Sequence, residues 1–190
     1  MSLPSPIKAI AIGGSAGSVA TLLEILKELP ATFRPSIFVT VHVPPNAGRS
    51  TLAEILRTHC QVAVMEAEDK EPVREGTVYI APANYHLLVE ASGSLALSTE
   101  EPVLFSRPSI DVLFESAADA YGAALLGVVL SGANEDGARG LAAIGQAGGA
   151  TMVQEPSTAY AAAMPLSALK LCPGAQAASP QQIATHLKQL

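Results

Sequence analysis

The chain has 190 residues, of which 49% are hydrophobic and 15% are charged, and its formal net charge is -6 at pH 7. This length allows one sizeable core and is short for two, so we expect residues 1–190 to form a single domain. The negative charge and the scattered positions of the 11 Lys and Arg residues argue against a surface that binds nucleic acid, but not against a protein partner.

Signals for export and for membrane insertion are missing from the sequence. The first residues lack the basic start and apolar core of a secretory signal, and no apolar run approaches the roughly 20 residues of a membrane span. Cys60 and Cys172 fit no metal or redox spacing, and we expect both to be free thiols in a reducing compartment. We therefore expect a cytoplasmic protein that has no membrane insertion and uses no metal ion or cofactor.

A buried strand followed directly by a helix opens the chain. Residues 7–12 are mostly apolar, and apolar residues recur at helical spacing over residues 19–29. Between them lies Gly-Gly-Ser-Ala-Gly at residues 13–17, whose glycines can take positive φ at little steric cost. Ser15 is therefore expected in a sharp turn, where the unpaired N–H groups of the new helix can face a bound molecule.

Three interpretations of this turn are open. The first is a phosphate cradle, but its fingerprint is G-x-G-x-x-G, whereas the glycines here are Gly13, Gly14 and Gly17, and the next strand ends in His42 rather than an acidic residue. The second is a nucleophile elbow, because Ser15 is the centre of a G-x-S-x-G pattern. The third is an ordinary tight turn between strand and helix.

The next buried strand ends at a histidine. Residues 37–41 are β-branched and aromatic, which is typical of a buried parallel strand, and His42 follows directly. The composition of residues 44–48 predicts a loop, residues 52–60 a helix and residues 62–65 a short strand.

The middle of the chain changes character. Apolar runs at residues 78–81 and 87–89 are followed by turn residues at 92–94 and another apolar run at 95–97, which predicts a hairpin in a β-rich insertion. We expect Ser109 to cap the helix that comes next.

Strands and helices alternate again in the C-terminal part. Strands are expected at residues 125–130 and 150–154, and helices after the polar loop at residues 131–137, over residues 157–169 apart from Pro165, and from Ser179 onward. This alternation predicts an α/β fold with a largely parallel sheet.

Three residues of one catalytic type follow three of the predicted strands. In an open parallel sheet, functional groups gather at the carboxyl ends of the strands, and Ser15, His42 and Asp136 are the residue types of a serine-hydrolase triad. Each also has a structural interpretation: His42 as a histidine hydrogen-bonded to backbone, and Asp136 as a cap of the helix that begins at Gly137. The conjunction of the three favours catalysis. The other histidines, on helix surfaces or after a turn, carry less information (His59, His186 and His86).

Several separate motifs occur in an order that resembles one known family, the catalytic domain of the CheB-type chemotaxis methylesterases, which are protein-glutamate methylesterases. The motifs are IGGSAGS at residues 12–18, VHVPP at 41–45, YIAPANYHL at 79–87, SRPSIDVLF at 106–114, LSGANEDGA at 130–138 and AMP at 163–165. They span nearly the whole chain and are far more specific together than G-x-S-x-G alone.

The resemblance implies a doubly wound, mostly parallel, Rossmann-like sheet with helices on both faces and an added antiparallel hairpin. It implies that Ser15 is the nucleophile, His42 the base and Asp136 the acid that orients the base. It further implies hydrolysis of γ-glutamyl methyl esters on the cytoplasmic helices of methylated chemoreceptors, often with glutamine deamidation. The alternative that we keep is a non-catalytic interaction or scaffold module with the same fold.

The sequence departs from the family pattern at the pocket. Ala16 stands where threonine is usual, Ser18 where glycine is usual and Ala133 where methionine is common. We assign Ala16 and Ala133 to the oxyanion site and ester pocket, because a backbone N–H survives these changes. No receiver domain is recognised in the sequence, so the partner domains that the resemblance suggests are a receiver or a methyltransferase.

Overall fold

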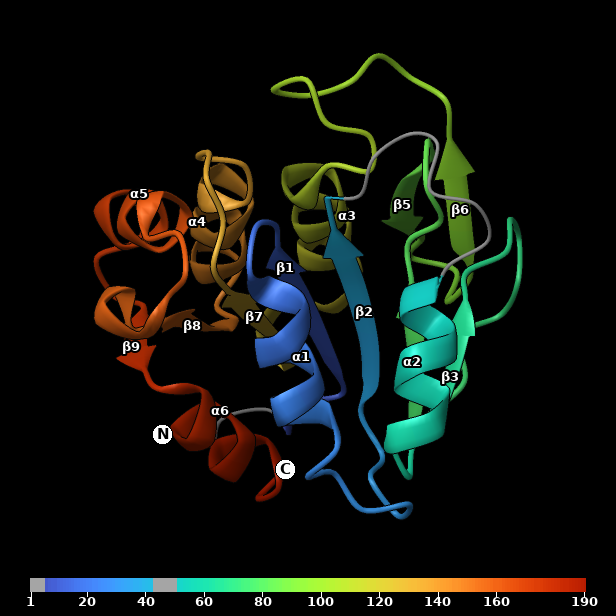
Figure 1. Ribbon diagram of the computed structural model, residues 1–190. Helices are drawn as coiled ribbons and strands as arrows, with labels where there is room; N and C mark the ends of the chain where they lie inside the picture. Colours follow the sequence, from blue (N-terminus) through green and yellow to red (C-terminus); the bar gives the residue numbers. More distant parts are fainter. Residues whose placement is uncertain (1–5, 43–50) are drawn as a thin grey trace, which may run out of the picture.

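The computed structural model describes residues 6–42 and 51–190, and its main feature is a parallel sheet of seven strands (Figure 1). In spatial order the strands are β3 (Ala63–Glu66), β4 (Thr77–Ile80), β2 (Ser36–Val41), β1 (Ala9–Gly14), β7 (Leu125–Val129), β8 (Ala150–Gln154) and β9 (Gln176–Ala178). Each neighbouring pair is parallel. The loop expected at residues 44–48 lies outside the described residues.

Helices cover both faces of this sheet (Figure 1). One face carries α1 (Ser18–Leu26), α2 (Thr51–His59) and α6 (Pro180–Leu187), and the other carries α3 (Ile110–Tyr121), α4 (Ala138–Gln146) and α5 (Ala163–Leu171). Alternate residues of β1 pack into the apolar cores on the two faces of the sheet. Ile10 and Ile12 pack with the first set of helices, and Ala9 and Ala11 pack with the second. The doubly wound α/β fold is confirmed.

The predicted hairpin is also confirmed. Strands β5 (His86–Val89) and β6 (Leu95–Ser98) pair antiparallel in a separate sheet, and their apolar side chains join the core beneath α3. The run at residues 78–81 belongs elsewhere. It contains β4, which lies inside the main sheet between β3 and β2 rather than in the insertion.

Two glycines expected in the first turn are instead part of a strand. Gly13 and Gly14 end β1, paired with Thr40 and Val41, and of the three glycines only Gly17 has a positive φ, at 77°. Close packing explains the two strand glycines, because an added Cβ at Gly13 would overlap the Ile110 side chain of α3. Helix α1 also ends earlier than expected, at residue 26 rather than 29.

The helix expected over residues 157–169 is broken in the structure. A short 3₁₀ turn, η2 (Pro156–Thr158), is followed by non-helical residues and then by α5. Hydrogen bonds between Ala161 and the loop after β7 draw this segment away from a helical path. Pro165 lies in the first turn of α5, where its missing N–H leaves no hydrogen bond unmade.

Local signals at helix ends and at the cysteines are confirmed. Ser109 caps α3, and Ser179 forms a capping box with Gln182 at the start of α6. Cys60 and Cys172 are free. A second 3₁₀ turn, η1 (Gly122–Ala124), connects α3 to β7. Over residues 6–42 and 51–190, no helix has the length and apolar character needed to span a membrane.

The contact between Gly13 and Ile110 gives the first prediction. Gly13→Ala should lower the free energy of unfolding by about 1–3 kcal/mol, because the new methyl group must displace a packed side chain. Gly174→Ala is the matched control, since a Cβ there meets open space, and it should change stability by less than about 0.5 kcal/mol. Urea denaturation of the three proteins measures both effects. Equal stability of Gly13→Ala and the wild type would contradict the packing argument.

Candidate active site

Ser15, His42 and Asp136 lie at the carboxyl ends of three adjacent strands. Ser15 follows β1, His42 follows β2, and Asp136 is in the loop between β7 and α4. The chain leaves β1 for β2 on one side and reaches β7 on the other, so the site lies at the topological switch point where open α/β sheets bind ligands (Figure 1).

Backbone hydrogen bonds fix the first two positions beside each other. The N–H of His42 donates to the carbonyl oxygen of Gly14 at 3.1 Å, and the N–H of Ser15 donates to that of Ser131 at 2.8 Å. Ser15 is half-buried, and its hydroxyl makes no hydrogen bond within the described residues. The Ser15 hydroxyl is therefore unengaged in this part of the chain and makes no hydrogen bond there to the His42 ring, whose nitrogens face Asp136 and Ser106.

The histidine and the aspartate are joined directly. His42 Nε2 lies 2.8 Å from Asp136 Oδ2, and the His42 side chain is 12% exposed while that of Asp136 is fully buried. The other ring nitrogen, Nδ1, lies 3.4 Å from the Ser106 hydroxyl. A ring held at one nitrogen by a carboxylate can accept a proton at the other, which is the role of a general base.

The Asp136 carboxylate also caps α3. Its oxygens accept hydrogen bonds from the N–H groups of Ile110 at 2.7 Å and Asp111 at 3.0 Å, and from the Ser109 hydroxyl at 2.9 Å. The structural interpretation of Asp136 as a cap of the following helix, α4, is therefore wrong, because its carboxylate serves a helix that precedes it in sequence.

These donors control the ionisation of Asp136. Burial alone would raise the pKa of the carboxyl, but hydrogen bonds from His42, Asp111 and Ile110 outweigh burial, and the pKa lies below its ordinary value. The residue is therefore an anion at neutral pH and favours a proton on the histidine nitrogen that faces it.

Asp111 caps the neighbouring helix, α4, in the same way. Its Oδ1 accepts hydrogen bonds from the N–H groups of Gly137 at 3.0 Å and Gly140 at 2.7 Å, at the start of α4. Burial raises the pKa of Asp111 and the charge of Asp136 adds to the rise, while the Gly140 hydrogen bond opposes it. Asp136 thus caps the helix that contains Asp111, and Asp111 caps the helix that follows Asp136.

A buried histidine that sequence reasoning passed over supports this arrangement. His86 Nδ1 accepts the N–H of Ser109 at 3.1 Å, and its Nε2 lies 3.1 Å from the Glu101 carbonyl oxygen, which places the ring proton on Nε2. His86 therefore positions the residue that donates to Asp136. The position of His86 after a turn in the sequence did not indicate that its side chain would be buried.

Ser131 holds together the loops that surround Ser15. Its hydroxyl donates to the Ala16 carbonyl oxygen at 2.7 Å and accepts the N–H of Ala161 at 2.9 Å, while its own N–H donates to buried Gln154. The N–H groups of Ala16 and Ala133, the expected oxyanion donors, have no hydrogen-bond partner in the described parts of the chain. Within the described residues, these two N–H groups are therefore free to donate hydrogen bonds.

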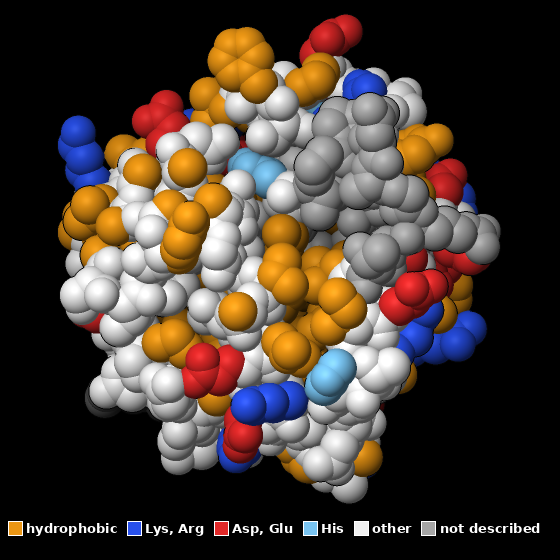
Figure 2. Space-filling model, in the orientation of Figure 1, with side chains coloured by type: hydrophobic (Ala, Val, Ile, Leu, Met, Phe, Trp, Pro, Cys, Tyr) orange, Lys and Arg blue, Asp and Glu red, His pale blue; other side chains and the backbone are white. Residues whose placement is uncertain are grey.

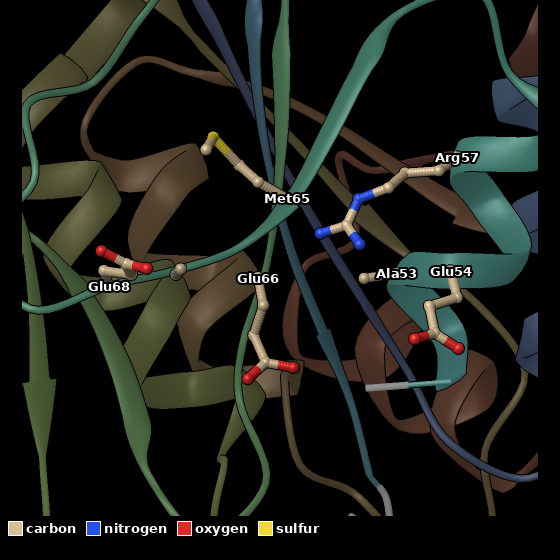
Figure 3. Close-up of a pocket in the computed structure, with 7 residues that line it drawn as sticks. Ala53, Glu54, Arg57, Met65, Glu66 and Glu68 are labelled. Atoms are coloured by element: carbon tan, nitrogen blue, oxygen red, sulfur yellow. The ribbon is translucent and has the colours of Figure 1, made fainter. Parts of the chain in front are cut away.

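A separate cleft of about 350 Å³ lies between α2 and β3 (Figure 3). Its walls include Glu54, Arg57, Glu66 and Glu68, and none of the described catalytic candidates lines it. Arg57 extends from α2 and donates to the Val64 carbonyl oxygen at 2.8 Å, which ties the helix to the edge strand of the sheet. This contact occupies one backbone acceptor of the edge strand.

No cluster of three or more metal-ligating side chains occurs among residues 6–42 and 51–190.

Comparisons with known proteins identify the family that the chain resembles. A family model described as CheB methylesterase matches residues 10–187. A Leptospira interrogans relative, provisionally named as a protein-glutamate methylesterase/protein-glutamine glutaminase, is 45% identical over 163 residues, covering 86% of this chain and 84% of its own length. The Salmonella typhimurium protein of that name is 40% identical over 172 residues, covering 89% of this chain but 49% of its own length, so this chain spans about half of that relative.

A solved structure has the same fold. The crystal structure of the Thermotoga maritima CheB methylesterase catalytic domain superposes with a TM-score of 0.91 at 30% sequence identity, covering 96% of this chain and 98% of that one.

The buried carboxylate gives a prediction about stability and pH. Because the pKa of Asp136 is lower in the folded than in the unfolded protein, its ionisation stabilises the fold above about pH 4, and this stabilisation is lost as the pH falls through the folded-state pKa. Asp136→Asn should be less stable than the wild type by roughly 1–3 kcal/mol at pH 7, and the difference should narrow toward about pH 3. Urea denaturation across this pH range measures it.

Asp119→Asn is the control for the loss of one negative charge, because Asp119 is an exposed residue of α3. A stability difference between Asp136→Asn and the wild type that stays constant or grows as the pH falls would contradict the assignment.

Proposed function

The chain belongs to the CheB methylesterase family, and on this basis we propose that it hydrolyses γ-glutamyl methyl esters on proteins, with methylated chemoreceptor helices as substrate. The names of its relatives also favour deamidation of protein glutamine, in which ammonia leaves instead of methanol. The observation that carries the proposal is the 2.8 Å hydrogen bond between His42 and the buried Asp136, beside Ser15.

The mechanism assigns a role to each residue. The anionic Asp136 holds the Nε2–H of His42, so that Nδ1 takes the proton of the Ser15 hydroxyl as its oxygen attacks the ester carbonyl carbon. The N–H groups of Ala16 and Ala133 stabilise the negative charge on the carbonyl oxygen.

The remaining steps release methanol and then hydrolyse the acyl-enzyme. His42 gives the proton to the departing methoxide, methanol leaves, and the glutamyl group remains attached to Ser15 as an ester. Water then loses a proton to His42 and attacks the acyl-enzyme, which releases the glutamate side chain and restores the Ser15 hydroxyl.

A non-catalytic scaffold is the alternative. The donors Ser109, Ile110 and Asp111 already hold Asp136, so the burial of this carboxylate does not by itself require catalysis. The observation against the scaffold is His42, which is not needed to cap α3 and yet is aligned on the carboxylate. The organisation of residues 1–190 as one catalytic domain, its cytoplasmic location and a receiver or methyltransferase partner remain predictions.

Removing the nucleophile tests the proposal. Ser15→Ala should lower kcat by a factor on the order of 10⁶, because no other group takes over the covalent step. Methanol release from a methylated chemoreceptor fragment and hydrolysis of a small glutamyl methyl ester are the two assays. Ser92→Ala, a change in the exposed turn of the hairpin, is the control and should keep wild-type rates.

Ser106→Ala separates two candidate nucleophiles, since Ser106 is the serine found 3.4 Å from His42 Nδ1. This variant should keep turnover. Loss of turnover in Ser106→Ala together with wild-type rates in Ser15→Ala would transfer the nucleophile role to Ser106.

A third substitution tests the pocket. Ala133 is exposed, and a longer side chain there should narrow the space for the leaving group without touching the triad. Ala133→Met should therefore change the preference between methyl and bulkier esters by a modest factor of about tenfold, the lower end of the range for one altered apolar contact. Measurements of kcat/KM on both esters decide it. Unchanged selectivity would mean that residue 133 does not line the ester pocket.

A further inference from the structure

The loop between β6 and α3 carries a turn that its sequence does not favour. Val103 and Ser106 exchange backbone hydrogen bonds of 3.0 and 2.8 Å, and the two residues between them, Leu104 and Phe105, have φ of 48° and 64°. Two successive positive φ angles are the pattern of a type I′ turn, which favours Asn-Gly. Bulky apolar residues are unfavourable there.

Packing within the molecule does not compensate for this strain. The Phe105 side chain is fully exposed, at 102%, and Leu104 is 41% exposed. The loop rises above the end of β2 at the top of Figure 1, and Figure 2 shows hydrophobic side chains at the same upper edge. Strained backbone that presents an unburied apolar group points to a role outside the fold.

The base of the loop is held firmly. The Arg107 guanidinium donates to the carbonyl oxygens of Thr99 and Glu100 at 2.8 and 2.9 Å and to the Asn84 side chain at 2.8 Å. The apolar turn is thus presented by an ordered base, which reduces the entropy lost when a partner binds.

The turn adjoins the candidate active site on the histidine side. Ser106, the residue after Phe105, contacts His42 Nδ1 at 3.4 Å. On the serine side lies Tyr160, which is 84% exposed, and its Cβ and ring occupy the space where a side chain at Gly17 would lie. We call Leu104, Phe105 and Tyr160 the apolar rim.

We propose that the apolar rim is the docking surface for the protein substrate, and that it binds apolar side chains on either side of the glutamyl ester. The inference rests on the proposed function. A protein that delivers a glutamyl side chain to Ser15 must cover the residues on both sides of Ser15 and His42, and these sides carry the rim. A small ester reaches Ser15 without touching the apolar rim.

The test compares two substrates for each variant. The probes are a methylated chemoreceptor fragment and N-acetylglutamic acid γ-methyl ester, and the readout is the ratio of kcat/KM on the first to kcat/KM on the second. The double variant Leu104→Asn, Phe105→Gly installs the residues that the turn favours, so it should fold at least as stably as the wild type. Tyr160→Ala keeps the Cβ that packs on Gly17.

Both rim variants should lower this ratio roughly tenfold or more, mainly by raising KM on the fragment, since buried aromatic anchors dominate interface energies. Leu171→Ala, at the C-terminal end of α5, removes a side chain that is 51% exposed and should leave the ratio unchanged. A ratio within about twofold of the wild type in both rim variants would overturn the proposal, because it would mean that the rim makes no energetic contact.

Binding measurements separate this inference from the proposed function. The Kd of the methylated fragment is measured for Ser15→Ala alone and combined with the rim substitutions, so that docking is read without turnover. Weaker binding after the rim substitutions supports docking even if no protein hydrolyses either ester, which would contradict only the proposed function. Equal binding, or wild-type dimers in sedimentation that the rim substitutions dissociate, would overturn the inference.

Discussion

The candidate active site depends on one buried anion at the start of a helix. An unpaired carboxylate inside a protein is strongly unfavourable, yet Asp136 is fully buried and ionised because Ser109, the first N–H groups of α3 and His42 all donate to it. The positive end of the α3 dipole adds to this stabilisation. The carboxylate that these donors hold also contacts His42, so the stability of the fold and the alignment of the proposed base have the same origin.

The exchange of caps between Asp136 and Asp111 extends this dependence to the packing of helices. Asp136 caps the helix that contains Asp111, and Asp111 caps the helix that follows Asp136, so α3 and α4 cannot shift relative to each other without breaking hydrogen bonds at the start of each helix. Gly140 is needed at the contact, because a side chain there would meet the backbone of Asp111. A change at Asp111 therefore reaches His42 through the position of the α3 terminus, without direct contact.

Sequence reasoning found the α/β fold and the strand ends that carry Ser15, His42 and Asp136, because buried strands and the residues after them are local patterns. It misplaced Gly14, where the Ser18 side chain fills the space of a Cβ, and Gly13, where the reason for glycine is a side chain of α3 about a hundred residues away. It missed His86 and the exchange of caps for the same reason. The three-residue strand β9, with no β-branched residue, has no pattern of its own and forms only by pairing with β8.

The departures from the family pattern at residues 16 and 133 change side chains in loops that are held by backbone hydrogen bonds. The Ser131 hydroxyl joins the Ala16 carbonyl to the Ala161 N–H, and the N–H of Gly132 donates to the Ala161 carbonyl oxygen at 3.0 Å. These bonds set the course of the loops on both sides of Ser15 without using either alanine side chain. The courses of these loops are therefore held by backbone and by Ser131, and they do not depend on the threonine and methionine that the family usually has at residues 16 and 133.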